Sequence, residues 1–285
     1  MRIRLIASDV DGTLLDADSR LPESNRRAVR AARRAGLAVV LCTGKSDHAI
    51  RGLVEELGLA DLPHATLNGG CLYHPARDER EVLHAIPPGA AWATAARLGA
   101  AGLPVAFYAP ARILALGFEG TGFARRVVEM GEPKPEPVAS AEEARAALAG
   151  EPLVKLLTLL PAGAPGAAAL ERRLAAGAPA GVRFVRTGPE YFEAIPEGAG
   201  KGAALRRIAG LLGVRREEIL AVGDAESDLA LFEAAGLRVA VANAAPEVAR
   251  AADMRVAAAA EGGVAEAIRR LALSGDAAGG VAPAG

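Results

Sequence analysis

Apolar positions in the first and last thirds of the chain alternate between short β-rich runs and amphipathic helical stretches. Short apolar runs indicate buried strands, and apolar residues spaced three and four apart indicate helices. The expected elements are, in chain order, a strand at Leu5 to Ser8, a helix at Glu23 to Ala35, a strand at Leu37 to Cys42, a helix at Asp47 to Leu57, a helix at Ala203 to Leu212, a strand at Ile219 to Val222, a helix at Ser227 to Ala235 and a strand at Leu237 to Val241. This alternation predicts an α/β fold, a doubly wound parallel sheet with a Rossmann-like core.

The middle of the chain has a different texture. Pro87-Pro88-Gly89 opens it, a Pro-rich patch occupies Pro133 to Pro137, and a solid apolar strand is expected at Leu153 to Leu160. We therefore predict an inserted α+β cap domain at 86–188 and a core assembled from 1–85 and 189–273. Residues 274–285 are mostly Gly, Ala and Pro, which predicts a disordered tail.

Composition excludes several classes of protein. No uncharged run exceeds 15 residues, which is too short for a transmembrane helix of about 20 apolar residues, so no membrane partner is expected. The run Ile3 to Ala7 lacks the features of a secretory signal, and we expect a cytoplasmic location. Cys42 and Cys71 have no C-x-x-C spacing and are expected to be free thiols.

Charge is balanced, with 33 basic and 34 acidic residues among 285 and a net charge of −1. Such a chain has no broad positive field, so nucleic acid is not an expected partner. Lysine occurs only at positions 45, 134, 155 and 201, and every other basic residue is arginine. A lysine set between glycines, as at Lys201, is therefore unusual in this sequence.

Two carboxylates, Asp9 and Asp11, directly follow the first predicted strand, and Gly12 then allows the backbone to turn. Crowded carboxylates repel one another, and a divalent cation commonly relieves the repulsion. One carboxylate could then attack phosphorus while its neighbour handles the leaving-group proton. An isolated Asp-x-Asp-Gly is also a common turn, stabilised by side-chain hydrogen bonds to the backbone.

Three further patterns lie at strand ends or at a helix start. Thr43-Gly44-Lys45 offers a hydroxyl and a flexible backbone N–H for phosphate oxygens, Gly200-Lys201-Gly202 supplies a compact cation, and Gly223-Asp224 begins a second acidic loop that ends at Asp228. Each pattern alone has an ordinary structural reading as a turn or a helix start. Because ligands of doubly wound sheets bind at the carboxyl ends of the strands, we expect all four patterns to form one site.

In this order and on this framework, the motifs resemble those of the haloacid dehalogenase superfamily, and within it the Cof-type sugar phosphatases. The resemblance covers about residues 1–273, with a cap inserted between the second and third motifs. It implies a Mg²⁺ cofactor and a role for each motif residue. The implied roles are Asp9 as nucleophile, Asp11 as general acid and base, Thr43 and Lys201 as ligands of the phosphoryl oxygens, and Asp9, the Asp11 carbonyl, Asp224 and the adjacent Asp228 as the metal site.

The implied activity is Mg²⁺-dependent hydrolysis of a small-molecule phosphomonoester, a sugar phosphate or similar metabolite, through an aspartyl-phosphate, by a monomer or homodimer. Three alternatives stay open. A phosphomutase would return the phosphate to its sugar, a response-regulator-like switch would only accept it, and a catalytically silent protein would only bind ligand. A cap of about 100 residues has no evident purpose in a switch.

This sequence departs from the family pattern at two positions. Ser227 stands where an Asn often helps to bind the metal, and Lys45 replaces the more usual Arg after Thr-Gly. Gly44 and Lys45 are nevertheless expected to contact phosphate or substrate. Asn243 matches a family loop near the phosphate and is equally compatible with a simple turn.

Other polar and aromatic residues have ordinary structural readings. The histidines at 48, 64, 74 and 84 lack metal-binding spacing. Trp92, Phe107 and Tyr108 could line a substrate pocket, although packing is their commoner use. Asn68-Gly69-Gly70 is read as a turn outside the site, and Glu193 or Glu197 could touch the substrate.

Overall fold

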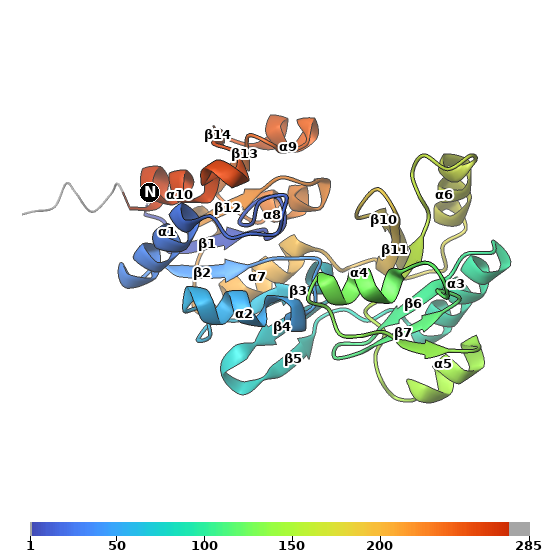
Figure 1. Cartoon of the computed structure of the whole chain (residues 1–285). Helices are drawn as coiled ribbons and strands as arrows, with labels where there is room; N and C mark the ends of the chain where they lie inside the picture. Colours follow the sequence, from blue (N-terminus) through green and yellow to red (C-terminus); the bar gives the residue numbers. More distant parts are fainter. Residues whose placement is uncertain (1, 274–285) are drawn as a thin grey trace, which may run out of the picture.

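The computed structural model describes residues 2–273, which form an α/β core and a cap lying side by side (Figure 1). The predicted disordered tail at 274–285 lies outside the described residues. None of the helices in the described part is both long and apolar enough to cross a membrane.

A five-stranded parallel sheet forms the centre of the core, in the order β14-β13-β12-β1-β2. Its strands are β1 (Leu5–Ser8), β2 (Ala38–Leu41), β12 (Ile219–Gly223), β13 (Leu237–Val241) and β14 (Met254–Val256). The chain moves from β1 to β2 on one side and from β12 through β13 to β14 on the other. The crevice where strand order reverses therefore lies at the carboxyl ends of β1 and β12.

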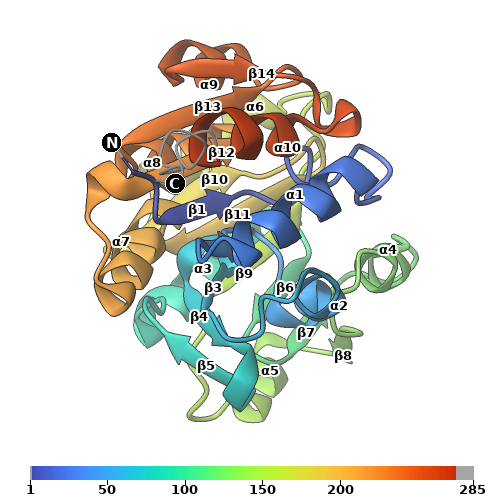
Figure 2. The same ribbon diagram turned by 90° about the vertical axis from the view of Figure 1, so that its left-hand side faces the viewer.

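Successive side chains of each strand point to opposite faces of this sheet, and on both faces they are apolar and buried. Helices therefore cover both faces. Ile6 packs with α1 (Glu23–Arg34), α2 (Asp47–Leu57) and α10 (Gly263–Ala267) on one face. Its neighbour Leu5 packs on the opposite face. Figure 2 shows a second group of helices beside that face of the sheet. These are α7 (Lys201–Leu212), α8 (Leu229–Glu233) and α9 (Pro246–Ala251).

A small antiparallel sheet lies beside the core and consists of β3 (His64–Thr66), β4 (Cys71–His74) and β5 (Glu79–Val82). A single bridge between Cys42 and Ala65 connects it to the end of β2. Cys42 and Cys71 are both buried free thiols, as predicted, and burial raises the pKa of each to about 12.

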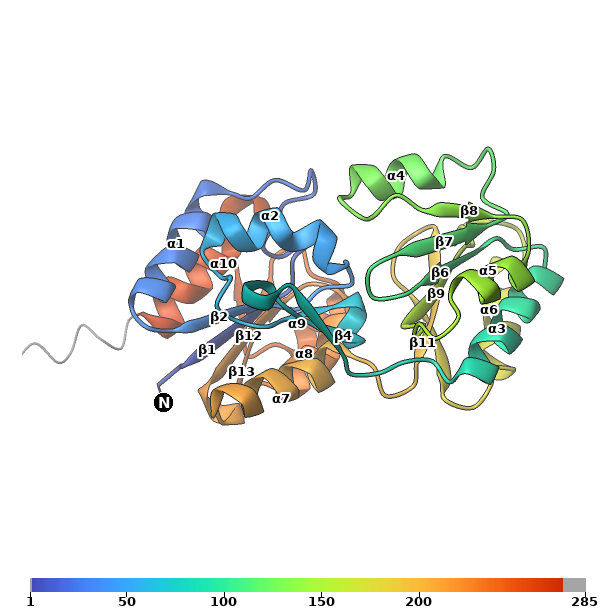
Figure 3. The same ribbon diagram turned by 90° about the horizontal axis from the view of Figure 1, so that it is seen from below.

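The cap contains a separate mixed sheet in the order β10-β11-β9-β6-β7-β8. Its strands are β6 (Val105–Tyr108), β7 (Ile113–Leu116), β8 (Glu136–Val138), β9 (Lys155–Leu159), β10 (Val182–Arg186) and β11 (Tyr191–Pro196). Its helices are α3 (Pro88–Ala100), α4 (Phe123–Glu129), α5 (Ala141–Ala147) and α6 (Ala167–Ala176). Figure 3 shows α4 on the side of the cap that faces the core.

The α/β architecture with an inserted cap is thus confirmed, and one detail differs from expectation. The expected domain boundary at 188 falls inside a hairpin, because β10 pairs antiparallel with β11 and β11 pairs with β9. Strand pairing therefore keeps the chain in the cap sheet until Pro196, and the return to the core follows just before α7 begins at Lys201.

Candidate active site

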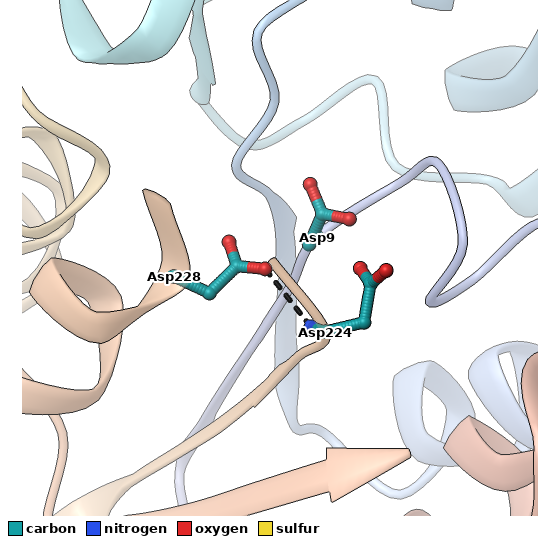
Figure 4. Close-up of side chains that lie close together, drawn as sticks. All are labelled: Asp9, Asp224 and Asp228. Carbon is teal, nitrogen blue, oxygen red and sulfur yellow. Dashed lines mark hydrogen bonds between the residues drawn. The ribbon is translucent and has the colours of Figure 1, made fainter. Parts of the chain in front are cut away.

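The first acidic loop follows β1 and the second follows β12, and these strands are neighbours in the sheet. Asp9 leaves β1 with its backbone N–H donated to the Val222 carbonyl at 3.0 Å. Asp224 is the first residue after β12. One carboxylate oxygen from each of Asp9, Asp224 and Asp228 lies within 4.8 Å of the other two, and Figure 4 shows the three side chains together.

The ammonium of Lys201 lies among these carboxylates. Its Nζ donates to Asp9 Oδ1 at 2.6 Å and to Asp228 Oδ1 at 2.7 Å, and all three side chains are buried. Lys201 is the first residue of α7, and α7 packs closely against α8. A Cβ at the following Gly202 would lie 2.0 Å from the Ala230 carbonyl oxygen, so only glycine permits this approach.

This cluster holds three carboxylates and one ammonium. Burial raises the pKa of Asp9 well above its usual value, although Lys201 lowers it. Burial likewise raises the pKa of Asp224. Burial alone would lower the pKa of Lys201, but Asp228 and Asp9 outweigh it and raise that pKa. The ionised forms of Asp9 and Asp224 are therefore disfavoured in this cluster, where one ammonium faces three carboxylates. A bound cation would stabilise them.

Asp228 organises the second acidic loop. Its Oδ2 accepts the backbone N–H groups of Asp224 and Ala225 at 2.9 and 3.0 Å, while Oδ1 holds Lys201. Thr13 donates its hydroxyl to Asp224 Oδ1 at 2.7 Å. Because both Asp228 oxygens already have donors, this residue positions Asp224 and Lys201; its predicted place beside the metal remains a prediction.

The first loop is shaped by Gly12, whose φ of +77° is a conformation that side chains disfavour. A Cβ at this position would also lie 2.6 Å from Asp224 Oδ2. Asn243 holds the loop from outside, because its Nδ2 donates to the Gly12 carbonyl and its Oδ1 accepts from the Ala259 N–H. Both ends of the Asn243 amide thus bind backbone, and its predicted contact with substrate remains a prediction.

The Thr43-Gly44-Lys45 loop lies between β2 and α2. Thr43 is buried, and its hydroxyl accepts the backbone N–H of Lys45 at 3.1 Å. Lys45 extends to Asp11, with Nζ 2.8 Å from Oδ1. The lysine that replaces the usual arginine therefore pairs with the predicted acid and base, and the two motifs lie together.

A cleft of about 840 Å³ opens above these loops, between core and cap. Its core wall includes the predicted residues Asp9, Asp11, Thr43, Gly44, Lys45, Lys201, Asp224 and Asn243, and Ser227 also lines it. Asp228 is fully buried behind this wall. The four loops that the sequence predicts to form one site therefore line one cleft, although they come from segments far apart in the chain.

The cleft also contains residues outside the four motifs, on the cap wall and at Asn68 of the core. Lys155 donates to Glu193 Oε1 at 2.9 Å, and Asn68 donates to Glu193 Oε2 at 3.0 Å. Tyr108 lies beneath Lys155, with Nζ 4.3 Å from the ring centroid. Asn68, read above as a turn outside the site, therefore lines the cleft, and Glu193 lines it as one of the two candidate residues.

The other candidates lie elsewhere. Phe107 is buried in the cap core against Trp92, with ring centroids 5.4 Å apart, and Glu197 is exposed. The sequence gives little indication that Lys155 and Glu132 belong to the cleft. Lys155 is one of four lysines in an arginine-rich chain and stands in an apolar strand, whereas nothing in the local sequence distinguishes Glu132, which also lines the cleft.

The donor set fits a hard divalent cation. Carboxylate and carbonyl oxygens are the ligands that Mg²⁺ prefers, and it is usually bound by one or two carboxylates with substrate phosphate and water completing its shell. Asp9 and Asp224 offer carboxylates at the mouth of the cluster, and the excess negative charge around Lys201 calls for a cation. The chemistry of the residues at this site therefore fits Mg²⁺.

Together, the fold and the site define a capped protein with a doubly wound α/β core and a cluster of aspartates suited to phosphate chemistry. The model of the haloacid dehalogenase-like hydrolase family matches residues 6–268. The putative phosphatase YxeH of Bacillus subtilis is 30% identical over 290 residues, covering 95% of this chain and 99% of that protein. The chain belongs to the haloacid dehalogenase-like hydrolase family.

Other similar proteins agree. The 5-amino-6-(5-phospho-D-ribitylamino)uracil phosphatase YwtE of Bacillus subtilis is 27% identical, covering 86% of this chain and 90% of its own. A haloacid dehalogenase-like hydrolase from Bacteroides thetaiotaomicron has a TM-score of 0.82 at 25% identity, covering 95% of this chain and all of that one. The subclass IIB sugar phosphatase BT4131 shares the fold, with a TM-score of 0.80 at 22% identity and coverage of 93% and 98%. The chain is thus a phosphatase of this family.

Proposed function

We propose that this phosphatase hydrolyses sugar phosphates or closely similar phosphomonoesters through a phosphorylated Asp9, with Mg²⁺ as cofactor. The observation that carries the proposal is the contact of Lys201 with Asp9, where the first acidic loop begins, and with Asp228, where the second ends. A buried ammonium at this position neutralises part of the charge that otherwise repels a phosphate dianion.

In the first step, an Asp9 carboxylate oxygen attacks phosphorus in line, while the bond from phosphorus to the leaving oxygen breaks. Asp11 in its acid form donates a proton to that oxygen. Lys45, 2.8 Å from Asp11, holds the Asp11 side chain, and Thr43 and Lys201 bind phosphoryl oxygens. In the second step, Asp11 takes a proton from water as the water attacks phosphorus, which restores free Asp9 and releases phosphate.

Asp9, the Asp11 backbone carbonyl and Asp224 would hold Mg²⁺, with Asp228 behind them. When bound, Mg²⁺ supplies positive charge next to the transferring phosphoryl group. The cap side of the cleft shields the site from bulk water, which would weaken the electrostatic interactions that stabilise the transferring phosphoryl group.

The relatives and the cleft support the proposed substrate class. YwtE and YcsE of Bacillus subtilis are named for hydrolysing a phosphoribityl compound, and BT4131 is named a sugar phosphatase. On the cap wall, Lys155 and Tyr108 offer hydrogen-bonding groups next to apolar Leu157. Hydroxyl-rich leaving groups suit such a wall. The phosphomutase and regulator alternatives have no specific observation in their favour.

The test is release of phosphate from p-nitrophenyl phosphate and a panel of sugar phosphates, with Mg²⁺ and with a chelator. Asp9→Asn should abolish turnover while circular dichroism stays unchanged, because an amide is a poor nucleophile. Asp18→Asn, which removes an exposed carboxylate from the same loop region, is the matched control. Mass spectrometry of the wild-type protein after rapid quenching should find one added phosphoryl group. Substantial turnover by Asp9→Asn would refute the assignment.

A further inference from the structure

Glu132, in the loop after α4, reaches from the cap across to the core. Its Oε1 accepts the backbone N–H of Ser46 at 3.0 Å, directly before α2 begins at Asp47. The adjoining Gly131 carbonyl lies 2.8 Å from Nδ1 of His48, which strengthens this contact between the domains. The Glu132 carboxylate is thus held at the end of the loop that carries Thr43 and Lys45.

The other oxygen of this carboxylate is unusual. Glu132 is 92% buried, since only 8% of its surface is exposed, yet within residues 2–273 Oε2 has no hydrogen-bond partner. The Ser46 hydroxyl beside it is also buried and unpartnered. The positive end of α2 stabilises the carboxylate only in part, because a helix N-terminus carries about half a unit charge.

The remaining charged groups of the cap wall are neutralised by partners within the cap. Lys155 is paired with Glu193. Arg186, the residue best suited to bind an anion, is paired with Glu171 and also donates to the carbonyl groups of Leu160, Gly188 and Pro189. In the described part of the cap wall, Glu132 is therefore the charged group without an ionic partner, and its sign is negative.

We propose that Glu132 is a specificity-determining residue that disfavours substrates whose leaving group carries a second anionic charge. The inference rests on the proposed function and narrows its substrates. A buried charge is poorly screened, so its repulsion of a carboxylate or second phosphate in the cleft is stronger than at a surface. Neutral hydroxyl-bearing leaving groups escape this repulsion, and the Tyr108 hydroxyl, which has no hydrogen-bond partner in the described chain, is available to them.

Glycerol phosphate and phosphoglycerate, each phosphorylated on the terminal carbon, test this directly. Where glycerol phosphate has a hydroxymethyl group, phosphoglycerate has a carboxylate. For both we would measure kcat/KM and competition with p-nitrophenyl phosphate, so that a ratio is obtained whether or not they are hydrolysed. For the wild-type protein, kcat/KM should be at least about tenfold higher for glycerol phosphate than for phosphoglycerate.

Glu132→Gln keeps an oxygen that accepts the Ser46 N–H but removes the charge. It should reduce the ratio of kcat/KM for glycerol phosphate to kcat/KM for phosphoglycerate by about tenfold. Glu129→Gln removes an exposed charge from the last residue of α4, three positions before Glu132, and should leave the ratio of the two kcat/KM values unchanged. An equal loss for both substrates in Glu132→Gln would assign the residue a purely structural role and overturn the proposal. So would a wild-type protein that treats both compounds alike. Absence of p-nitrophenyl phosphate turnover would instead overturn the proposed function.

Discussion

Lys201 and Asp9, 192 residues apart in sequence, are joined by a hydrogen bond of 2.6 Å in the centre of the site. The parallel sheet makes this possible, because β1 and β12 are neighbours and α7 leads into β12. Since Lys201 is also bound to Asp228, one ammonium connects the nucleophile loop to the second acidic loop. Removal of that ammonium should therefore affect both stability and activity.

Lys201→Met retains most of the side-chain volume but leaves Asp9 and Asp228 without their cation. Breaking a buried pair in this way costs about 3–5 kcal/mol of unfolding free energy, and some of this should be recovered in Mg²⁺. Phosphatase activity should fall at least about 100-fold. Urea unfolding with and without Mg²⁺ and phosphate release check the two effects. Lys134→Met, at an exposed position of the cap, should show neither.

Gly12→Ala introduces a methyl group 2.6 Å from Asp224 Oδ2 in a backbone with positive φ. The backbone conformation costs about 1 kcal/mol, and the clash must in addition displace Asp224. Gly36→Ala provides the comparison, because Gly36 has a φ of +80° and no atom near the added methyl group. We expect similar backbone destabilisation in both variants but a raised Mg²⁺ requirement for activity only in Gly12→Ala. Equal Mg²⁺ dependence would contradict the placement of Asp224 in the metal site.

Most of the core could be predicted from the sequence, because its strands are buried and its helices begin at clear signals. The elements Leu5–Ser8, Asp47–Leu57 and Leu237–Val241 begin and end where the pattern predicts. The expected helix at Ser227 to Ala235 is instead a 3₁₀ turn at Glu226–Asp228 followed by α8. Asp228 there accepts backbone N–H groups of its own loop, a competition with helix formation that periodicity does not reveal.

The core wall of the site was predictable for the same reason as the sheet, since its residues are fixed to strand ends. The place of Asn68 in the cleft was not predictable. Its side chain bonds to Glu193 of the cap, and its backbone has an unusual positive φ of 54°. Glu132 is likewise defined by the docking of cap against core. Contacts between two domains depend on an orientation that no local pattern encodes.

His64 makes stability depend on pH. It is fully buried, its Nδ1 accepts the Leu41 N–H at 3.1 Å, and burial lowers its pKa from 6.5 to about 4. Between these values the unfolded chain binds the proton that the folded protein refuses. The stabilisation is therefore complete above pH 6.5 and is lost as pH falls towards 4, by about 3 kcal/mol in total.

His64→Asn keeps an acceptor for the Leu41 N–H but does not titrate. The difference in unfolding free energy between the wild-type protein and this variant, measured in urea at intervals from pH 4 to 8, should increase with pH and level off above the upper pKa. A difference that stays constant would show that folding does not lower the pKa of His64.

Ser227 offers the most direct test of the metal site, since it lines the cleft beside the acidic loop where the family often has Asn. Ser227→Asn adds a carbonyl oxygen of the kind that Mg²⁺ accepts, on a residue that is exposed and can change side chain without repacking. We expect the Mg²⁺ concentration for half-maximal activity to fall about tenfold, in line with the effect of residues around a metal. Ser227→Ala should leave it nearly unchanged if the hydroxyl does not bind the ion. A tenfold rise in Ser227→Ala would instead make the serine itself a ligand, and the metal site would then include Asp9, Asp224 and Ser227.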